Sequence, residues 1–96
     1  MSAFIIIRVE VNDPSALKGY QALVPPILEK YRGKFIVRGG STLTLEGPAE
    51  SRRIIVLEFP ELHDAEAFYK SPEYLEACKL REGIAIFESI AIEGIK

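Results

Sequence analysis

The sequence predicts an α+β fold in which a four-stranded antiparallel sheet carries its helices on one face only. The expected elements follow the order strand, helix, strand, strand, helix, strand. The strands at residues 4–11 and 53–59 are apolar on both faces, whereas 96 residues supply only enough helix to cover one face. We therefore expect another molecule to cover the second face.

Length and composition indicate a single domain, residues 1–96, because the chain is slightly shorter than the roughly 100–150 residues of a common domain. A net charge of -2 gives no electrostatic reason to expect a nucleic acid partner. The lone cysteine, Cys78, cannot form an internal disulfide, which favours a reducing, cytoplasmic location. The apolar run at residues 3–7 is too short for a signal peptide or a membrane span, so no membrane partner is expected.

The first strand is expected at residues 4–11, where side chains alternate between the two faces. One face would carry Ile5, Ile7, Val9 and Val11, and the other Phe4, Ile6, Arg8 and Glu10. Residues 12–15 then supply a capping side chain followed by proline, a pattern typical of a helix start.

A helix is predicted from the cap at residues 12–15 to Gly33. Its apolar stripe consists of Leu17, Tyr20, Val24, Ile27, Leu28 and Tyr31. Pro25 and Pro26 remove two backbone donors, so a kink or a break is expected near Val24.

The second and third strands are predicted at residues 34–38 and 53–59. In the former, alternation places Phe35 and Val37 on one face and Ile36 and Arg38 on the other. The glycines at 39 and 40 predict a turn or bulge, and residues 42–46 a further short extended piece.

Helical spacing recurs at residues 61–70, and Ser71 followed by Pro72 predicts a new helix start. The inward side of this last helix is expected to carry Tyr74, Leu75 and Cys78, with Arg81 as a further candidate. Residues 84–95 predict a final, mostly apolar strand.

This β-α-β-β-α-β order is that of the ferredoxin-like fold, whose crossovers place both helices on one face. The first and third strands are then central neighbours, so Arg8 and Glu58 are expected to meet on the uncovered face. The uncovered face also predicts a homodimer, because each large aliphatic side chain left in water forgoes roughly 1.5–3 kcal/mol.

Several segments resemble a known family. They are YRGKFIVRGG at residues 31–40, LEG at 45–47, VLEFP at 56–60 and AFYKSPEY at 67–74. With these motifs the chain resembles the small, mainly bacterial proteins classed as a domain of unknown function within the dimeric α/β-barrel superfamily. The resemblance implies a ferredoxin-like protomer that pairs sheet to sheet with a second copy, and it implies no settled activity.

Relatives in that superfamily include cofactor-free monooxygenases, haem-handling enzymes and lactone or dienelactone processing proteins, which use the cavity between sheet and helices. Their motifs have no match in this chain. The haem-degrading members carry a ligand histidine, whereas the sole histidine of this chain, His63, lies at an expected helix start. No cofactor is therefore expected.

Arg38 is the main candidate for ligand binding, since a planar, always-charged guanidinium beside two glycines suits a carboxylate or an enolate. An ion pair with Glu58 or Glu88, or an exposed strand end, is the alternative. Arg8 and Glu58 are further candidates, paired with each other or across the dimer, although such a pair more often fixes strand registry than performs catalysis.

Tyr69 and Tyr74 flank the expected helix break, where their hydroxyls can reach a pocket mouth, and Arg81 can close the same mouth. Core packing for the tyrosines and a solvated helix end for the arginine are the alternatives. The family resemblance implies that these three residues stand at positions where the family has tyrosine and arginine. His63 is a candidate because an unperturbed imidazole can exchange a proton near neutral pH, but a solvated position at a helix start is the default for this residue. No second histidine completes a zinc site, so no metal is expected.

Three functions stay open. The first is a homodimer that binds a small, partly apolar, anionic metabolite in a cavity lined by Arg38, Arg8, Glu58 and the tyrosines. The second is an enzyme acting on such a molecule without a cofactor, by proton transfer or oxygen addition, because the motifs of acyl and hydride transfer have no match. The third is a structural or partner-binding dimer without a ligand.

Overall fold

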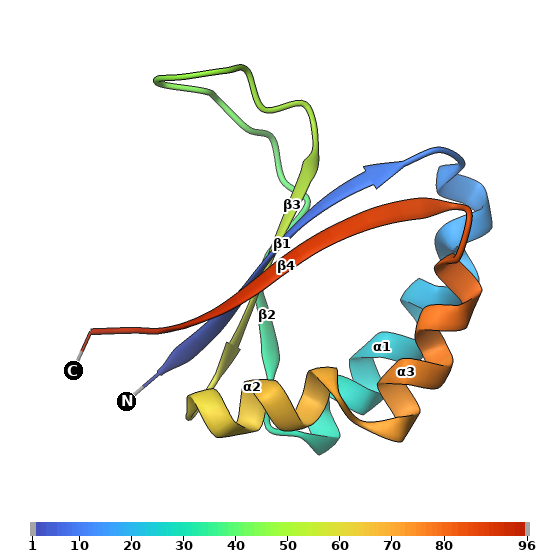
Figure 1. Cartoon of the computed structure of the whole chain (residues 1–96), viewed down its shortest axis with the longest axis vertical. Helices are drawn as coiled ribbons and strands as arrows, with labels where there is room; N and C mark the ends of the chain where they lie inside the picture. Colours follow the sequence, from blue (N-terminus) through green and yellow to red (C-terminus); the bar gives the residue numbers. More distant parts are fainter. Residues whose placement is uncertain (1, 96) are drawn as a thin grey trace.

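The computed structural model describes residues 2–95, and its strands form one sheet in the order β2-β3-β1-β4. The strands are β1 (Ala3–Val11), β2 (Lys34–Arg38), β3 (Arg53–Phe59) and β4 (Ala85–Glu93). Each neighbouring pair is antiparallel, and the helices lie on one side of the sheet (Figure 1). The predicted ferredoxin-like α+β fold is thus confirmed.

The first crossover begins with a short 3-10 turn, Pro14–Leu17, and continues as α1 (Lys18–Lys30). The carboxylate of Asp13 caps this turn by accepting hydrogen bonds from the Ala16 amide at 3.4 Å and the Ser15 hydroxyl at 2.8 Å. The cap followed by proline therefore starts the helix, as predicted.

Helix α1 continues without interruption through Pro25 and Pro26, so the predicted alternative of a break is wrong. Proline at position 26 leaves the Ala22 carbonyl without its helical donor. Ala22 and Pro26 are both exposed, so water can bond to the Ala22 carbonyl and the helix can continue.

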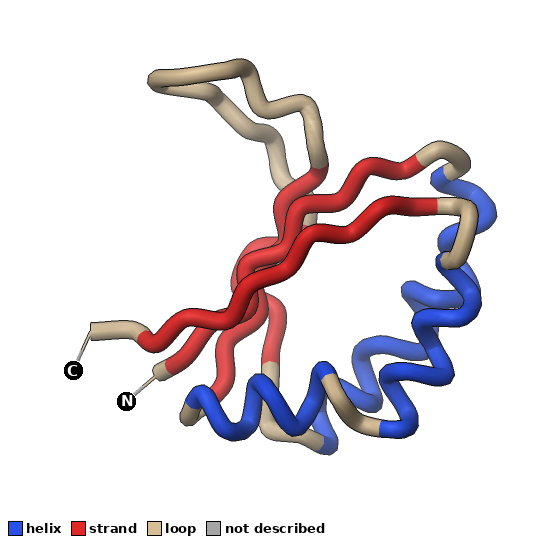
Figure 2. Tube along the Cα trace, in the orientation of Figure 1, coloured by secondary structure: helices blue, strands red, loops and turns tan. Residues whose placement is uncertain are grey.

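The second crossover contains α2 (Leu62–Tyr69), α3 (Pro72–Cys78) and a 3-10 turn, Lys79–Arg81. The hydroxyl of Ser71 caps α3 by accepting a hydrogen bond from the Tyr74 amide at 3.1 Å. The predicted restart at Ser71 is therefore confirmed, and it turns the chain sharply between α2 and α3 (Figure 2).

The core lies between the sheet and the helices. Its largest fully buried side chains are Tyr74, Phe59, Phe68, Leu28, Leu57 and Val9. Leu75 was expected on the inward side of α3 but is 54% exposed, because Tyr74 and Ala77 already occupy the buried positions.

Strand β2 contains a β-bulge between Phe35 and Val37. Phe35 pairs with Leu57, whereas Arg38 pairs with Ile55, two residues earlier on the same face of β3. The extra residue of the bulge thus places Arg38 on the helix side of the sheet together with Phe35. Strict alternation had placed these two side chains on opposite faces, and that expectation is wrong.

Residues 39–52, which we call the arm, join β2 to β3 and project from the sheet (Figure 1). The extended piece expected at residues 42–46 lies in the arm but pairs with no strand. Within residues 2–95, no helix is both long and apolar enough to cross a membrane.

Candidate functional site

An aromatic cavity of about 40 Å³ lies between the sheet and the helices. Its walls are formed by Ile7, Tyr20, Gln21, Val24, Phe35, Arg38, Arg53, Ile55, Leu57, Phe68, Tyr74 and Phe87. These residues come from all four strands and from α1, α2 and α3, so the cavity exists only in the folded chain.

Two arginines lie where β2 ends and β3 begins. The Arg38 guanidinium carbon lies 4.1 Å from the centre of the Phe35 ring, a cation–π contact that depends on the bulge. Arg53 packs against Gly39, whose φ of 71° belongs to the left-handed region. A side chain at Gly39 would collide with the Arg53 guanidinium, so this glycine leaves the space that Arg53 occupies.

The hydroxyls of Tyr20 and Tyr74 form a buried hydrogen bond with 2.6 Å between their oxygens. Burial raises the pKa of Tyr20 to about 12, and burial followed by the neighbouring Tyr20 raises the pKa of Tyr74. Both phenols are therefore protonated at neutral pH and act in the cavity as hydrogen-bonding groups rather than bases.

Arg81 lies beside the same aromatic cluster. Its guanidinium carbon is 3.8 Å from the centre of the Phe87 ring and 5.5 Å from that of Tyr20. One terminal nitrogen donates to the Cys78 sulfur at 3.2 Å, whereas the buried Nε has no hydrogen-bond partner within the described residues. A buried donor left unpaired is costly, so this nitrogen is suited to a further acceptor.

Arg38, Arg53 and Arg81 share one electrostatic property: within residues 2–95, none has a carboxylate oxygen within 4.0 Å. Most other cations are paired, namely Arg8, Lys30, Arg32, Lys34, Arg52, Lys70 and Lys79. The positive charge around the aromatic cavity is thus not neutralised by the protein's own acids.

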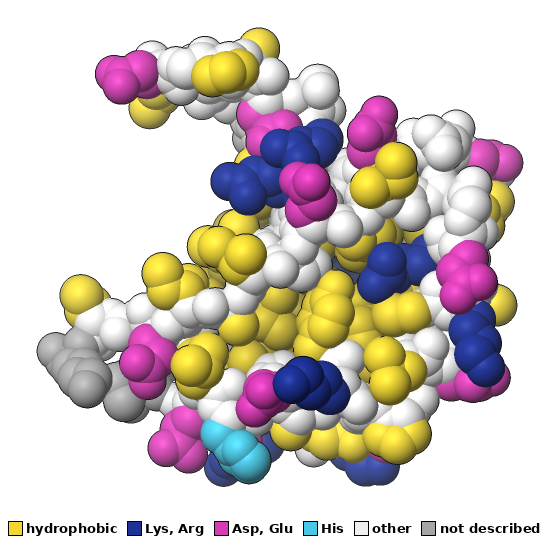
Figure 3. Space-filling view, in the orientation of Figure 1, with side chains coloured by type: hydrophobic (Ala, Val, Ile, Leu, Met, Phe, Trp, Pro, Cys, Tyr) yellow, Lys and Arg dark blue, Asp and Glu magenta, His cyan; other side chains and the backbone are white. Residues whose placement is uncertain are grey.

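A separate open groove of about 570 Å³ lies between α2 and β4, where apolar side chains form a hollow (Figure 3). At its inner end the Tyr69 hydroxyl lies 2.9 Å from the Ser89 hydroxyl. The Tyr69 ring is 4.9 Å from the Tyr74 ring, so tyrosines connect the groove to the aromatic cavity. His63 also lines this groove, apart from the three unpaired arginines.

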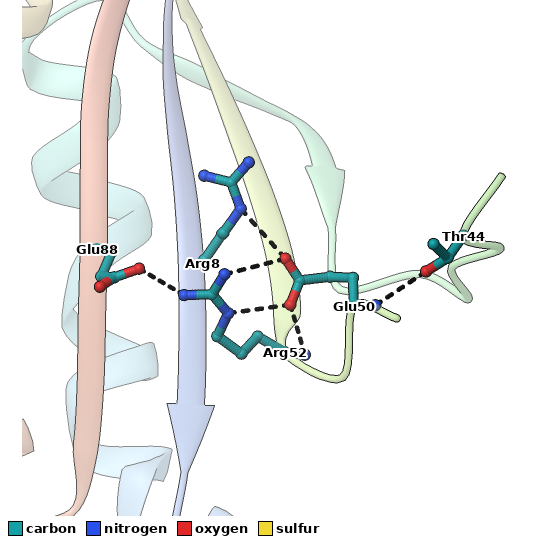
Figure 4. Close-up of polar contacts among 5 residues, drawn as sticks. All are labelled: Arg8, Thr44, Glu50, Arg52 and Glu88. Atoms are coloured by element: carbon teal, nitrogen blue, oxygen red, sulfur yellow. Dashed lines mark hydrogen bonds and ion pairs between the residues drawn. The ribbon is translucent and has the colours of Figure 1, made fainter. Parts of the chain in front are cut away.

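Arg8 and Glu58 lie on the uncovered face but do not meet, so their expected contact is wrong. The register pairs Arg8 with Ile54 and Phe4 with Glu58. Arg8 instead donates to Glu50 at 3.2 Å (Figure 4), while Lys34 lies 3.4 Å from Glu58. Both lie on the face opposite to Arg38, so neither lines the aromatic cavity of its own chain.

The structure brings Arg38, Tyr74 and Arg81 to the aromatic cavity and its rings, with Tyr69 packed against Tyr74, whereas Arg8, Glu58 and His63 lie elsewhere. Sequence reasoning assigned Tyr20 to the core stripe and did not single out Arg53. The apolar spacing around Tyr20 indicates a core position and gives no sign that its hydroxyl contacts Tyr74. Nothing in the local pattern indicates that Arg53 shares a site with Arg38. Among residues 2–95, no group of three or more His, Cys, Asp or Glu side chains is placed to hold a metal ion.

Comparison with solved structures shows what this chain is similar to. A protein of unknown function from Rhodopseudomonas palustris is 23% identical, with a TM-score of 0.75 over 99% of this chain and 83% of that one. A dimeric protein of unknown function with a ferredoxin-like fold from Bacteroides fragilis is 17% identical, with a TM-score of 0.67 over 97% and 96%. These similarities support the fold.

A third similar structure is SnoaB from Streptomyces nogalater, a cofactor-independent oxygenase, at 12% identity and a TM-score of 0.69 over 99% of this chain and 94% of that one. A search of curated proteins gives no match. A family model, by contrast, matches almost the whole chain, residues 2–95. The chain therefore belongs to the domain of unknown function DUF1330.

Proposed function

We propose that this protein is a homodimer that binds a small, partly apolar, anionic metabolite between its sheet and its helices. The observation that carries this proposal is a set of three arginines without a carboxylate partner within residues 2–95: Arg38 and Arg53 line one aromatic cavity, and Arg81 stacks on the Tyr20 and Phe87 rings of its wall. A guanidinium offers a planar fork of donors that matches a carboxylate, and an aromatic wall suits the apolar part of such a ligand.

The size of the cavity limits the ligand. Its volume of about 40 Å³ is close to the roughly 30 Å³ that one water molecule occupies. The ligand that suits this cavity therefore places its anionic group at the mouth, beside Arg38 and Arg53, and only a small apolar group inside.

The homodimer in this proposal rests on the uncovered face of the sheet. Its exposed side chains include Ile86, Ile90 and Ile92 of β4. The similarity to a dimeric ferredoxin-like protein supports a dimer. The single Cys78 fits a reducing compartment, and we include a cytoplasmic location in the proposal.

Native mass spectrometry of gently purified protein tests the dimer and reveals any retained small molecule. Thermal unfolding with matched acids and amides then tests charge recognition, using propionate against propionamide and butyrate against butyramide. We expect the acids to raise the unfolding temperature and the amides not to, because only a ligand that binds the folded state shifts unfolding.

Substitution separates specific recognition from general charge. Arg38→Met, Arg53→Met and Arg81→Met should each weaken binding of the retained molecule or the acid at least about tenfold, a loss of about 1.4 kcal/mol. Lys18→Met removes the same charge from an exposed position of α1 that has no ion pair within residues 2–95, and this variant should bind normally. Equal affinity in all four variants would exclude the arginine site.

A second candidate function is a cofactor-free enzyme acting on the same ligand. It is favoured by the Tyr20–Tyr74 hydroxyl pair, since a protonated phenol can donate a hydrogen bond to an oxygen that gains negative charge. The similarity to a cofactor-independent oxygenase is consistent with this candidate. Tyr74→Phe should then lower kcat on the retained molecule while its Kd changes little, whereas a wild-type protein that leaves the molecule unchanged in air would exclude it.

A further inference from the structure

The arm, residues 39–52, lies outside the packed body of the molecule. It leaves the sheet on the side of the uncovered face, so that a notch opens between the arm and that face (Figure 3). Connections of this length without a helix or strand are at the upper limit for compact domains, roughly 12–15 residues, and are usually either functional loops or linker segments.

The outer part of the arm is apolar and exposed. Leu43 is 82% exposed and Leu45 is 88% exposed. Both lie on the segment that projects beside the notch, so neither contacts the core of its own chain. Two such side chains on one projecting segment are suited to burial against another molecule.

The base of the arm is fixed by a polar network (Figure 4). The Glu50 carboxylate accepts hydrogen bonds from the Arg52 amide at 3.1 Å, from the Arg52 Nε at 2.9 Å and from Arg8 at 3.2 Å. The Glu50 amide donates to the Thr44 hydroxyl at 2.9 Å, which ties the two sides of the arm together. A segment held in position before association loses less conformational entropy when it docks.

The same network supplies charge complementarity for a second copy of this chain. Arg52 also donates to Glu88 of β4 at 2.5 Å, so two cations and two anions, from Arg8, Arg52, Glu50 and Glu88, lie together on the uncovered face. In a twofold dimer that places this cluster near its axis, cations and anions of the two copies can alternate, and the balanced cluster adds no net repulsion. A partner with an excess of one charge would gain less from it.

We propose that the arm clasps a second copy of this chain, with Leu43 and Leu45 buried against the partner. This inference rests on the proposed homodimer but not on the proposed ligand. It assigns to residues 39–52 a share of the dimer interface in addition to the sheet face.

Sedimentation velocity over a dilution series tests the clasp. The variant Leu43→Ser/Leu45→Ser should raise the dimer dissociation constant about 100-fold or more, because two leucines are exposed again on each copy. The matched control, Leu23→Ser/Leu75→Ser, changes two exposed leucines of α1 and α3 and should leave dissociation unchanged. Circular dichroism checks that all variants are folded.

The outcomes separate the clasp from the dimer itself. A wild-type chain that stays monomeric at every concentration overturns both the homodimer and the clasp. A wild-type dimer whose dissociation constant is unchanged by the arm substitutions overturns the clasp alone.

A second measurement needs no destabilising change. In a Cys78→Ser background, Leu45→Cys should react with a maleimide at least about tenfold more slowly in the dimer than after dilution to monomer, since burial blocks access. Equal rates in the two states overturn the clasp.

Discussion

The hydroxyl oxygens of Tyr20 and Tyr74 lie 2.6 Å apart, although 54 residues separate them in the chain. Tyr20 belongs to α1 and Tyr74 to α3, so this contact joins the two crossovers above the sheet. In a pair of protonated phenols one hydroxyl donates to the other, and the accepting hydroxyl keeps its own hydrogen. That hydrogen is free to bond to a ligand in the aromatic cavity.

Alkaline pH should destabilise the fold through this pair. Burial raises the pKa of Tyr20 from 10.0 to about 12, so the unfolded chain ionises at a lower pH than the folded chain. The contribution of Tyr20 to stability is therefore full below pH 10 and is lost as the pH rises through about 12. Urea unfolding of the wild type should therefore show a falling free energy of unfolding from pH 9 to pH 11.

The Tyr20→Phe variant provides the comparison. At pH 7 it should be about 1–3 kcal/mol less stable, since the buried Tyr74 hydroxyl loses its partner. Its loss of stability between pH 9 and pH 11 should be smaller than that of the wild type. A loss as large in the variant would show that other groups cause the alkaline effect.

Gly39→Ala should cost about 1–3 kcal/mol of stability, because the new side chain collides with Arg53 and the φ of 71° disfavours any residue except glycine. Acid binding should weaken as well, since Arg53 must move. Gly40→Ala is the matched control: no atom lies within 4 Å of its added Cβ, so both properties should stay close to wild type. Urea unfolding and the thermal assay with butyrate measure them, and equal behaviour of the two variants would contradict the described packing.

Acid should weaken the base of the arm. Hydrogen bonds from Arg52 are the main cause that lowers the pKa of Glu50 from 4.5 to about 2. A depressed pKa gives stability that is present above pH 4.5 and is lost as pH falls through about 2.

Unfolding measured from pH 5 to pH 2 should accordingly show a smaller loss of stability for Glu50→Gln than for the wild type. Glu46→Gln serves as the control, because Glu46 lies in the same arm without an ion pair in the described chain. If Glu50→Gln loses as much stability in acid as the wild type, Glu50 is not the source of the acid dependence.

Double-mutant cycles should distinguish the observed registry from the one expected from sequence. Arg8 and Glu50 form an ion pair, so substituting both should reveal a coupling of about 0.2–1 kcal/mol. Arg8 and Glu58 do not meet, so their coupling should be near zero. A larger coupling for the second pair, measured by urea unfolding, would contradict the register of β1 and β3.

The elements that sequence predicted well are those controlled by local chemistry. Alternation within β1 and β3, the Asp13 and Ser71 caps and the apolar stripe of α1 each act over a few residues. Their agreement on one topology is why the fold was predictable.

Registry was not predictable from the same information. The expected Arg8–Glu58 contact differs from the observed pairing of Arg8 with Ile54 by four residues along β3. A shift by an even number keeps every side chain on its face, and both faces of these strands are apolar. The hydrophobic pattern therefore fits the wrong registry nearly as well as the right one.

The site was predictable only in part. Arg38 was singled out from its charge and its neighbouring glycines, but its face depends on the bulge, which no alternation rule indicates. Tyr20, Arg53 and Arg81 come from three distant segments and approach one another only after the helices pack on the sheet. Such convergence is a property of tertiary structure.

The bulge in β2 has a consequence for how this family can diverge. Loss of the extra residue between Phe35 and Val37 would restore regular alternation but leave Arg38 on the helix side, because it would then follow Phe35 by two positions. A strand that kept all its residues and lost the bulge would instead turn Arg38, and its positive charge, from the aromatic cavity to the uncovered face. In related chains the presence of the bulge, rather than the length of β2, is therefore the marker of an arginine that faces the cavity.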